Sequence, residues 1–179
     1  MELIEKAKNI AEKAHEGQVR KTDGTPYIVH PFAVADILKK YDFGDTVIAA
    51  ALVHDVLEDT DVTEEYLRQE LGDEVANIVV AVSEDKSLPW KERKKRYIET
   101  VSNAGDSVKA VSIADKIHNA KSVLLSHAVM GEEVWNKFNR GKEEKLWFEN
   151  AMLEMLKARW KHPLMTEYET LVSQLNALV

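Results

Sequence analysis

An adjacent histidine and aspartate, His54 and Asp55, close an apolar run of the sequence that begins at Thr46. Burying two such side chains in a helix costs roughly several kcal/mol unless each finds a partner. A divalent cation is a suitable partner, because it binds an imidazole nitrogen and a carboxylate oxygen together. The dipeptide alone is a weak signal, since it also occurs by chance.

Two further residues of the same types stand at helical positions flanked by apolar residues. His30 precedes Pro31 at the start of an expected helix, and Asp115 lies inside the apolar stretch 112–119. A histidine such as His30 is, on its own, more typical of a helix start than of a metal ligand. Asp115 is harder to explain as structure, because an unpaired carboxylate in a buried helix is unfavourable. Taken together, the four residues predict one metal site: His30, His54, Asp55 and Asp115.

Acidic residues follow the His54-Asp55 pair at once. On one helix, Glu58 is at i+3 and Asp59 at i+4 from Asp55, so the three carboxylates would project from one face. A solvated acidic helix end is the ordinary interpretation of such a run. Acids at a helix C-terminus oppose the helix dipole, however, which favours a compensating cation nearby. Glu58 and Asp59 are therefore candidates for acid/base catalysis.

Helical periodicity runs through most of the chain, and strand patterns are nearly absent. Residues 18–29, with Gly24 and Pro26, are expected to form a loop. No repeat or linker divides the sequence, so we expect one all-α domain over residues 1–179, a helical bundle. The expected helices cover residues 2–16, a segment that starts at 30, 46–58, 63–71, 73–83, 90–100, 106–128, a short segment between 131 and 141, 142–160 and 163–178.

Composition excludes several classes of protein. The 179 residues are 45% hydrophobic and 31% charged, as in ordinary soluble globular proteins. The absence of cysteine excludes disulfides, thiolate metal sites and cysteine nucleophiles. A formal net charge of −7 disfavours a nucleic-acid partner. There is no apolar stretch of membrane-spanning length and no signal-peptide core at the amino terminus, so we expect no membrane partner and a cytoplasmic location.

The order His…His-Asp…Asp resembles the HD superfamily of metal-dependent phosphohydrolases. Five stretches around it resemble one branch, the hydrolase domain of RelA/SpoT-type alarmone enzymes and the stand-alone small alarmone hydrolases. They span roughly residues 11–120, about two thirds of the chain. The stretches are Ala14-His-Glu-Gly-Gln-Val-Arg-Lys, Thr25-Pro-Tyr-Ile-Val-His-Pro, Ala50-Ala-Leu-Val-His-Asp-Val-Leu-Glu-Asp-Thr, Asp85-Lys-Ser-Leu-Pro-Trp-Lys-Glu-Arg-Lys and Ser112-Ile-Ala-Asp-Lys-Ile-His-Asn.

This resemblance implies a helical bundle of the HD-domain type in which the four predicted ligands bind one metal, typically manganese. The ligand set itself also permits iron or zinc. Dinuclear HD proteins insert further histidines between the His-Asp pair and the last aspartate, and residues 56–114 contain none. We therefore expect a single divalent ion.

The resemblance also implies a nucleotide-binding side of the site. Arg20 and Lys21 resemble the basic pair that contacts the nucleotide in these hydrolases, although surface charge near a turn is an equal interpretation of the residues alone. Two adjacent cations suit a ligand with diphosphates. Asn119 and Ser122 lie at i+4 and i+7 from Asp115, on the face that holds base and ribose in the family. His118 is expected to point elsewhere.

Lys91 to Arg96 is the only basic cluster in this acidic sequence. A solvated helix face is its default interpretation. The alternative is a rim that attracts a polyanionic substrate, an effect that salt would screen.

Three hypotheses for function follow. The first is hydrolysis of the 3′-diphosphate of the guanosine alarmones (p)ppGpp to GDP or GTP and pyrophosphate, with a guanine nucleotide as the small-molecule partner. The second is another HD-type nucleotide phosphohydrolase, such as a 5′-nucleotidase or an NADPH phosphatase, with the same metal and carboxylates. The third is a nucleotide-binding module without catalysis, against which the intact Glu58 and Asp59 argue.

Overall fold

The structure, a computed structural model, describes residues 2–21 and 23–178. Over these residues it is helical and contains no strand beyond an isolated bridge between Val19 and Pro26, which confirms the predicted all-α class. The helices are α1 (Glu2–Ala14), α2 (Val29–Lys40), α3 (Asp45–Leu52), α4 (Val56–Asp59), α5 (Glu64–Leu71), α6 (Asp73–Val82), α7 (Trp90–Asn103), α8 (Asp106–Met130), the 3-10 helix η1 (Gly131–Lys137), α9 (Gly141–Arg159) and α10 (Pro163–Asn176).

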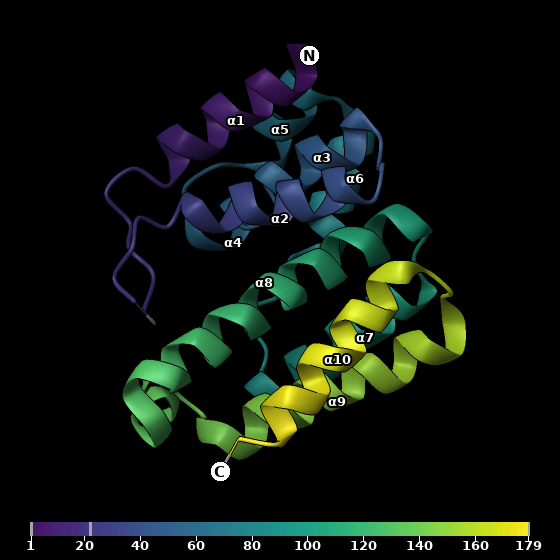
Figure 1. Cartoon of the computed structure of the whole chain (residues 1–179). Coiled ribbons are helices and arrows are strands. Elements are labelled where there is room, and N and C mark those ends of the chain that lie inside the picture. The colour runs from purple at the N-terminus through teal and green to yellow at the C-terminus, as the bar shows by residue number, and fades with distance from the viewer. Residues whose placement is uncertain (1, 22, 179) are drawn as a thin grey trace.

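The helices form two groups that meet along α8 (Figure 1). Helices α1 to α6 lie on one side of α8, and α7, α9 and α10 lie on the other. α8 is 25 residues long and packs against α2, α3, α6, α7 and α10. Apolar side chains of both groups belong to one buried core. Because α8 carries Asp115, this carboxylate lies where the two groups meet.

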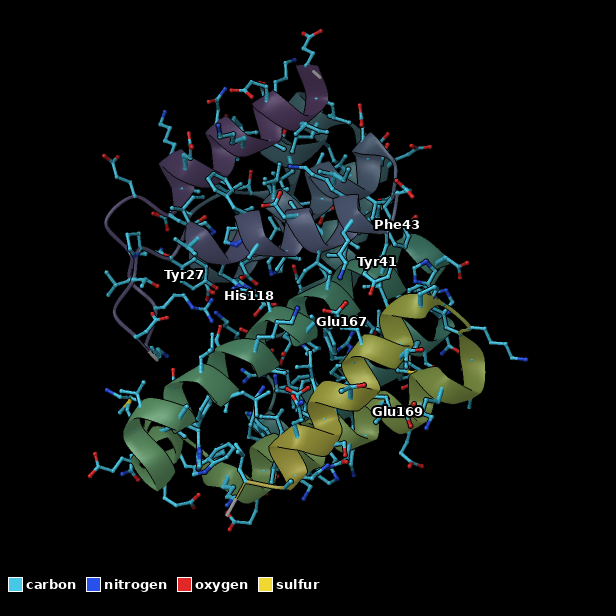
Figure 2. All side chains as sticks on the ribbon, in the orientation of Figure 1. Tyr27, Tyr41, Phe43, His118, Glu167 and Glu169 are labelled. Carbon is cyan, nitrogen blue, oxygen red and sulfur yellow. The ribbon has the colours of Figure 1, made fainter. Side chains whose placement is uncertain are left out.

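A polar contact at the end of α2 fixes the two groups relative to each other. Tyr41 Oη donates to Glu167 Oε2 at 2.6 Å, and Lys121 Nζ donates to Glu167 Oε1 at 2.6 Å. Figure 2 shows Tyr41 and Glu167 facing each other between α2 and α10. Since Lys121 belongs to α8, the contact joins the end of α2 and helix α10 to the central helix.

The helix expected over residues 46–58 is broken, so that part of the prediction is wrong. α3 ends at Leu52, and α4 begins only at Val56. The cause is His54, whose Nδ1 lies 2.7 Å from the carbonyl oxygen of Ala51. In a continuous helix that oxygen would accept from the N–H of Asp55. The imidazole of His54 replaces the Asp55 N–H as the donor to this oxygen, and the chain turns.

The break has a direct consequence for the site. Neighbouring side chains on a regular helix point about 100° apart. In the turn, His54 Nε2 and Asp55 Oδ2 instead lie 3.1 Å apart. The residues that the sequence marks as a pair therefore face one point.

Most other boundaries agree with the sequence within a few residues. α8 extends to Met130, where Gly131 ends it with a φ of 58° that glycine adopts at little cost. The short segment between Gly131 and Gly141 is a 3-10 helix. Within residues 2–21 and 23–178, no helix is both long and apolar enough to cross a membrane.

Candidate metal centre

Donor atoms from α2, from the turn after α3 and from α8 converge on one point. His30 Nε2 lies 3.1 Å from Asp115 Oδ1 and 3.4 Å from Asp55 Oδ2. His54 Nε2 lies 3.1 Å from Asp55 Oδ2 and 3.8 Å from Asp115 Oδ1. Ligand atoms that lie about 2.1 Å from a shared ion are about 3 to 4 Å apart. These spacings therefore fit a single cation.

The chemistry of His54 supports the same fit. Its Nδ1 is engaged by the Ala51 carbonyl, which requires the ring proton on that nitrogen. In the neutral ring Nε2 carries the lone pair, and this buried atom makes no aligned hydrogen bond within the described part of the chain. A buried nitrogen without a hydrogen bond is unfavourable unless it has another partner. A cation between His54, His30 and Asp115 would be that partner.

His118 holds His30 from behind. The two Nδ1 atoms are 2.7 Å apart. Burial lowers the pKa of His118 to about 4, so the ring is neutral near pH 7 and its Nδ1 can accept. His30 Nδ1 then donates, which leaves His30 Nε2 free to face the carboxylates. The expectation that His118 points elsewhere is wrong. It lies at i+3 from Asp115, and that spacing could have placed it on the same helix face.

Both carboxylates of the centre are ionised. Burial opposes this, but the neighbouring His54 and His30 hold the pKa of Asp55 well below its usual range. Burial likewise opposes ionisation of Asp115, and Lys116 together with His30 keeps the pKa of Asp115 well below its usual range. The centre therefore offers two negative oxygens to a cation.

Three further side chains orient these carboxylates. Tyr27 Oη donates to Asp55 Oδ2 at 2.6 Å. Asn119 Nδ2 donates to Asp115 Oδ1 at 2.5 Å, and Lys116 Nζ donates to Asp115 Oδ2 at 2.7 Å. The sequence reasoning assigned no role to Tyr27 or Lys116. The adjacency of lysine to aspartate inside an apolar helix was an available signal, because a buried lysine requires a paired acid.

The two candidate catalytic acids line the same cavity as the centre but differ in environment. Glu58 Oε1 accepts from the backbone N–H of Glu84 at 2.8 Å. Burial, followed by the negative charge of Asp55, raises the pKa of Glu58 to about 7. Asp59 is more exposed, and its Oδ1 accepts from Lys86 Nζ at 2.7 Å.

The loop before α2 brings Arg20 to α8. It is closed by a hydrogen bond of 2.8 Å from the Arg20 N–H to the Thr25 carbonyl. Arg20 Nη2 donates to Ser122 Oγ at 3.2 Å and to Asn119 Oδ1 at 3.4 Å. Arg20 Nε is buried without a hydrogen-bond partner among the described residues. Arg20 therefore contacts two of the other predicted substrate-binding residues, Asn119 and Ser122. The remaining one, Lys21, lines the same cavity as the metal centre.

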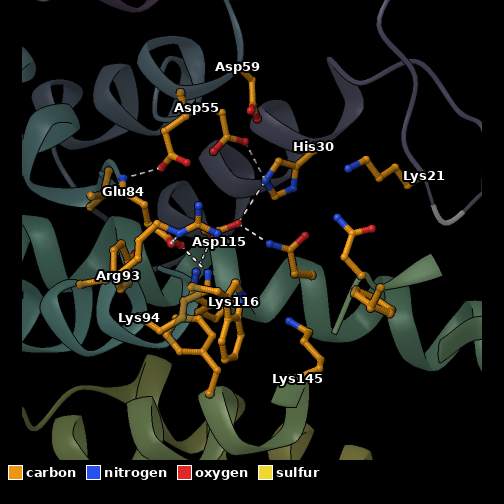
Figure 3. A pocket seen from close by; sticks show the side chains of 18 of the residues that line it. Lys21, His30, Asp55, Asp59, Glu84, Arg93, Lys94, Asp115, Lys116 and Lys145 are labelled. Atoms are coloured by element: carbon orange, nitrogen blue, oxygen red, sulfur yellow. Dashed lines mark hydrogen bonds and ion pairs between the residues drawn. The ribbon is translucent and has the colours of Figure 1, made fainter. Parts of the chain in front are cut away.

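This cavity has a volume of about 1160 Å³. The basic cluster of residues 91–96 lies at the edge of this cavity. Arg93 and Lys94 line the cavity, whereas Lys91, Lys95 and Arg96 are exposed. Lys116 and Lys145 join the first two (Figure 3). We call Arg93, Lys94, Lys116 and Lys145 the basic wall. A cation centre between carboxylates and basic side chains is suited to hydrolysis of a phosphate ester.

Comparison with known proteins agrees with this chemistry. A sequence model of the HD domain family matches residues 7–138. The guanosine-3′,5′-bis(diphosphate) 3′-pyrophosphohydrolase MESH1 of Danio rerio is 42% identical over 123 residues, which are 68% of this chain and 68% of the relative.

Two solved structures share the fold. The protein lmo0812 of Listeria monocytogenes superposes with a TM-score of 0.77 at 35% identity, over 82% of this chain and 97% of the other. A metazoan ortholog of SpoT, which hydrolyses ppGpp, superposes with a TM-score of 0.83 at 26% identity, over 100% of this chain and 98% of the other.

Proposed function

The chain belongs to the HD domain family, and on that basis we propose that it hydrolyses the 3′-diphosphate of (p)ppGpp, releasing pyrophosphate and leaving GDP or GTP. The observation that carries the proposal is the convergence of His30, His54, Asp55 and Asp115 within one cavity that also holds Glu58 and cationic side chains. The relative MESH1 of Danio rerio is named as a guanosine-3′,5′-bis(diphosphate) 3′-pyrophosphohydrolase.

An HD-domain hydrolase implies a divalent metal, and His30, His54 and Asp115 together with the adjacent Asp55 would hold it. We propose Mn²⁺, because the resemblance to the alarmone hydrolases implies this ion and the ligand set permits it. When bound, the ion supplies Lewis acidity toward a phosphoryl oxygen and lowers the pKa of water at the site.

The protein side chains divide the remaining work. Glu58, with its pKa near neutrality, would accept the proton of the attacking water. Asp59, held by Lys86, would steer that water. Asn119 and Ser122 would hold the nucleoside on α8, and Arg20 with Lys21 would bind the substrate's second diphosphate, the one on the 5′ carbon.

The direct test is purified protein with Mn²⁺ and ppGpp, followed by separation of the products. We expect pyrophosphate and GDP in equal amounts. Orthophosphate as the product would instead support another HD-type nucleotide phosphohydrolase, such as a 5′-nucleotidase or an NADPH phosphatase. Tight ppGpp binding without turnover under any divalent metal would establish a non-catalytic module.

Replacing Arg20 with alanine should raise the KM for ppGpp by about ten- to a hundredfold, because a charge-assisted contact to phosphate is worth roughly 1.5–3 kcal/mol. Bound metal should be unchanged, since Arg20 contacts Asn119 and Ser122 rather than the four predicted ligands. The effect should shrink as salt rises. A small phosphomonoester, which has no second diphosphate, should be affected less. Equal sensitivity of both substrates would place Arg20 at the reacting phosphate instead.

Replacing His118 with leucine should weaken metal binding by about ten- to a hundredfold, the usual cost of losing a partner that orients a histidine ligand. The physical reason is the lost acceptor for His30 Nδ1. Asparagine at this position supplies an acceptor and should recover part of the affinity, measured by calorimetric titration with Mn²⁺. Equal losses in both variants would show that His118 acts only through packing.

A further inference from the structure

The proposed function assigns no substrate contact to the basic wall, yet the wall adjoins the predicted metal centre. Lys116 Nζ contacts Asp115 Oδ2 at 2.7 Å, so the wall begins one carboxylate away from the centre. Lys94 Nζ and Lys116 Nζ lie 4.4 Å and 5.2 Å from the centroid of the Phe148 ring. Lys145 reaches the same cavity from α9. Ammonium groups from three helices therefore gather at one end of the cavity.

The wall carries more positive than negative charge. Arg93 and Lys94 share a single carboxylate, that of Glu84. The partner of Lys116 is Asp115, whose charge the predicted metal also uses. Lys145 pairs with the fully buried Glu149, so the printed ion pairs of these four cations involve three carboxylates among the described residues. An anion in the cavity would relieve this excess.

Two details of the wall are consistent with a place for an anion. Burial, followed by the charge of Lys116, lowers the pKa of Lys94, so the cations there disfavour one another. Arg93 Nε lies 2.9 Å from Glu84 Oε2, but neither atom makes an aligned hydrogen bond among the described residues. The Arg93 N–H thus faces a carboxylate without alignment, and a better-placed acceptor would satisfy it.

Arg93 and Lys94 of the wall lie on the opposite side of the centre from the Arg20-Lys21 pair (Figure 3). Arg20 contacts Asn119 and Ser122, which follow Asp115 along α8. The wall contacts Asp115 itself and continues toward the start of α8, where Tyr97 meets Ser112 at 2.8 Å. Figure 3 shows Lys21 on one side of Asp115 and Arg93 with Lys94 on the other. A substrate that reacts at the centre meets cationic groups in both directions.

We propose that the basic wall binds the distal phosphate of the 3′-diphosphate, the phosphate that leaves as half of pyrophosphate. This assignment rests on the proposed function. In that reaction the water oxygen bonds to the phosphorus next to O3′, the bond between that phosphorus and O3′ breaks, and O3′ takes up a proton. The ribose lies on the Asn119 side, so the distal phosphate extends from the reacting phosphorus away from it. The wall therefore selects a 3′-diphosphate over a 3′-monophosphate.

The test compares Lys94→Gln with Lys95→Gln on three substrates. Lys95 is the matched control, because it is the next residue of α7 and is exposed. The substrates are ppGpp, the analogue with a 5′-monophosphate and a 3′-diphosphate, and the analogue with a 5′-diphosphate and a 3′-monophosphate. They vary the two ends of the nucleotide separately.

In Lys94→Gln we expect kcat/KM to fall by about ten- to a hundredfold for both 3′-diphosphates, the usual range for loss of a charged phosphate contact. The 3′-monophosphate should change by less than about threefold, and Lys95→Gln should resemble the wild type for all three. A loss that follows the 5′-diphosphate would place that end at the wall and overturn the proposal. Equal losses for all three substrates would also overturn it, because they would indicate general damage to the site.

A binding measurement separates this proposal from the proposed function. Calorimetry on the Mn²⁺-loaded protein, with equal metal in cell and syringe, compares pyrophosphate with orthophosphate. We expect the wild type to bind pyrophosphate at least about tenfold more tightly, and Lys94→Gln to lose that preference. If the protein does not hydrolyse ppGpp but still prefers pyrophosphate, the proposed function is wrong and the anion site stands. Equal affinities of the wild type for pyrophosphate and orthophosphate would contradict the proposed anion site. If Lys94→Gln does not fold, Arg93→Gln replaces it in both experiments.

Discussion

Replacing His54 with alanine should abolish metal binding and pyrophosphate release together. His54 Nε2 is one of four converging donor atoms, and its Nδ1 bond to Ala51 also sets the turn that presents Asp55. The variant therefore loses one ligand and the orientation of a second. Metal content after dialysis and ppGpp turnover are the two measurements. His127→Ala is the matched control, because this histidine contacts Glu132, away from the centre.

Thermal unfolding gives a readout that does not depend on activity. A ligand at a hundredfold excess over its Kd stabilises the folded state by about 2.7 kcal/mol. For a protein of this length that corresponds to a rise in Tm of roughly 5–10 °C. We expect Mn²⁺ to produce this rise in the wild type and in His127→Ala but not in His54→Ala. Full metal content in His54→Ala would contradict the assignment of this histidine as a ligand.

Lowering the pH should weaken metal binding, as the His54→Ala substitution does. Burial alone would lower the pKa of His54, but the carboxylates of Asp55 and Asp115 raise it well above its usual value. A protonated imidazole has no lone pair for a metal, so protons and the cation compete for this centre. The affinity for Mn²⁺ should therefore fall as the pH falls.

The types of the site residues could be predicted from the sequence, but their directions could not. Histidines and aspartates inside apolar helices are expensive without a partner, which is why the His54-Asp55 pair and Asp115 indicate a metal site. The break after α3 was missed because helical periodicity does not show a side chain that competes with the backbone. His54 takes the carbonyl of Ala51, and only the folded chain shows that it does so.

The basic wall shows the same limit at longer range. The run of cations at residues 91–96 is visible in the sequence, but the packing of α7 decides that Arg93 and Lys94 face the cavity. Lys116 and Lys145 stand apart from that run and from each other along the chain. Lys116 meets it at the Phe148 ring, and Lys145 lines the same cavity, only because α8 and α9 both pack near α7. Local patterns contain no information about such a meeting.

Replacing Glu58 with glutamine should lower turnover by roughly two to four orders of magnitude, as loss of a general base does. Glutamine keeps an oxygen that can accept from the Glu84 N–H, so the fold and the metal content should remain. Asp59→Asn is the matched comparison, because Asp59 is exposed and already paired with Lys86. We expect a smaller loss in that variant. Loss of metal in Glu58→Gln would make Glu58 a ligand, and a larger loss in Asp59→Asn would reverse the two roles.

The pH profile tests the same assignment through a different property of Glu58. Its pKa is raised to about 7 by burial and by the charge of Asp55. A general base works only when it is deprotonated, and a bound cation lowers the pKa of a nearby carboxyl group, so the turnover of the wild type should fall by about tenfold per pH unit once the pH drops below a midpoint that lies under the metal-free value. Saturating Mn²⁺ at each pH separates this effect from loss of metal. In Glu58→Gln the residual turnover should lack that decline. A decline that persists in this variant would assign the titrating base to another group.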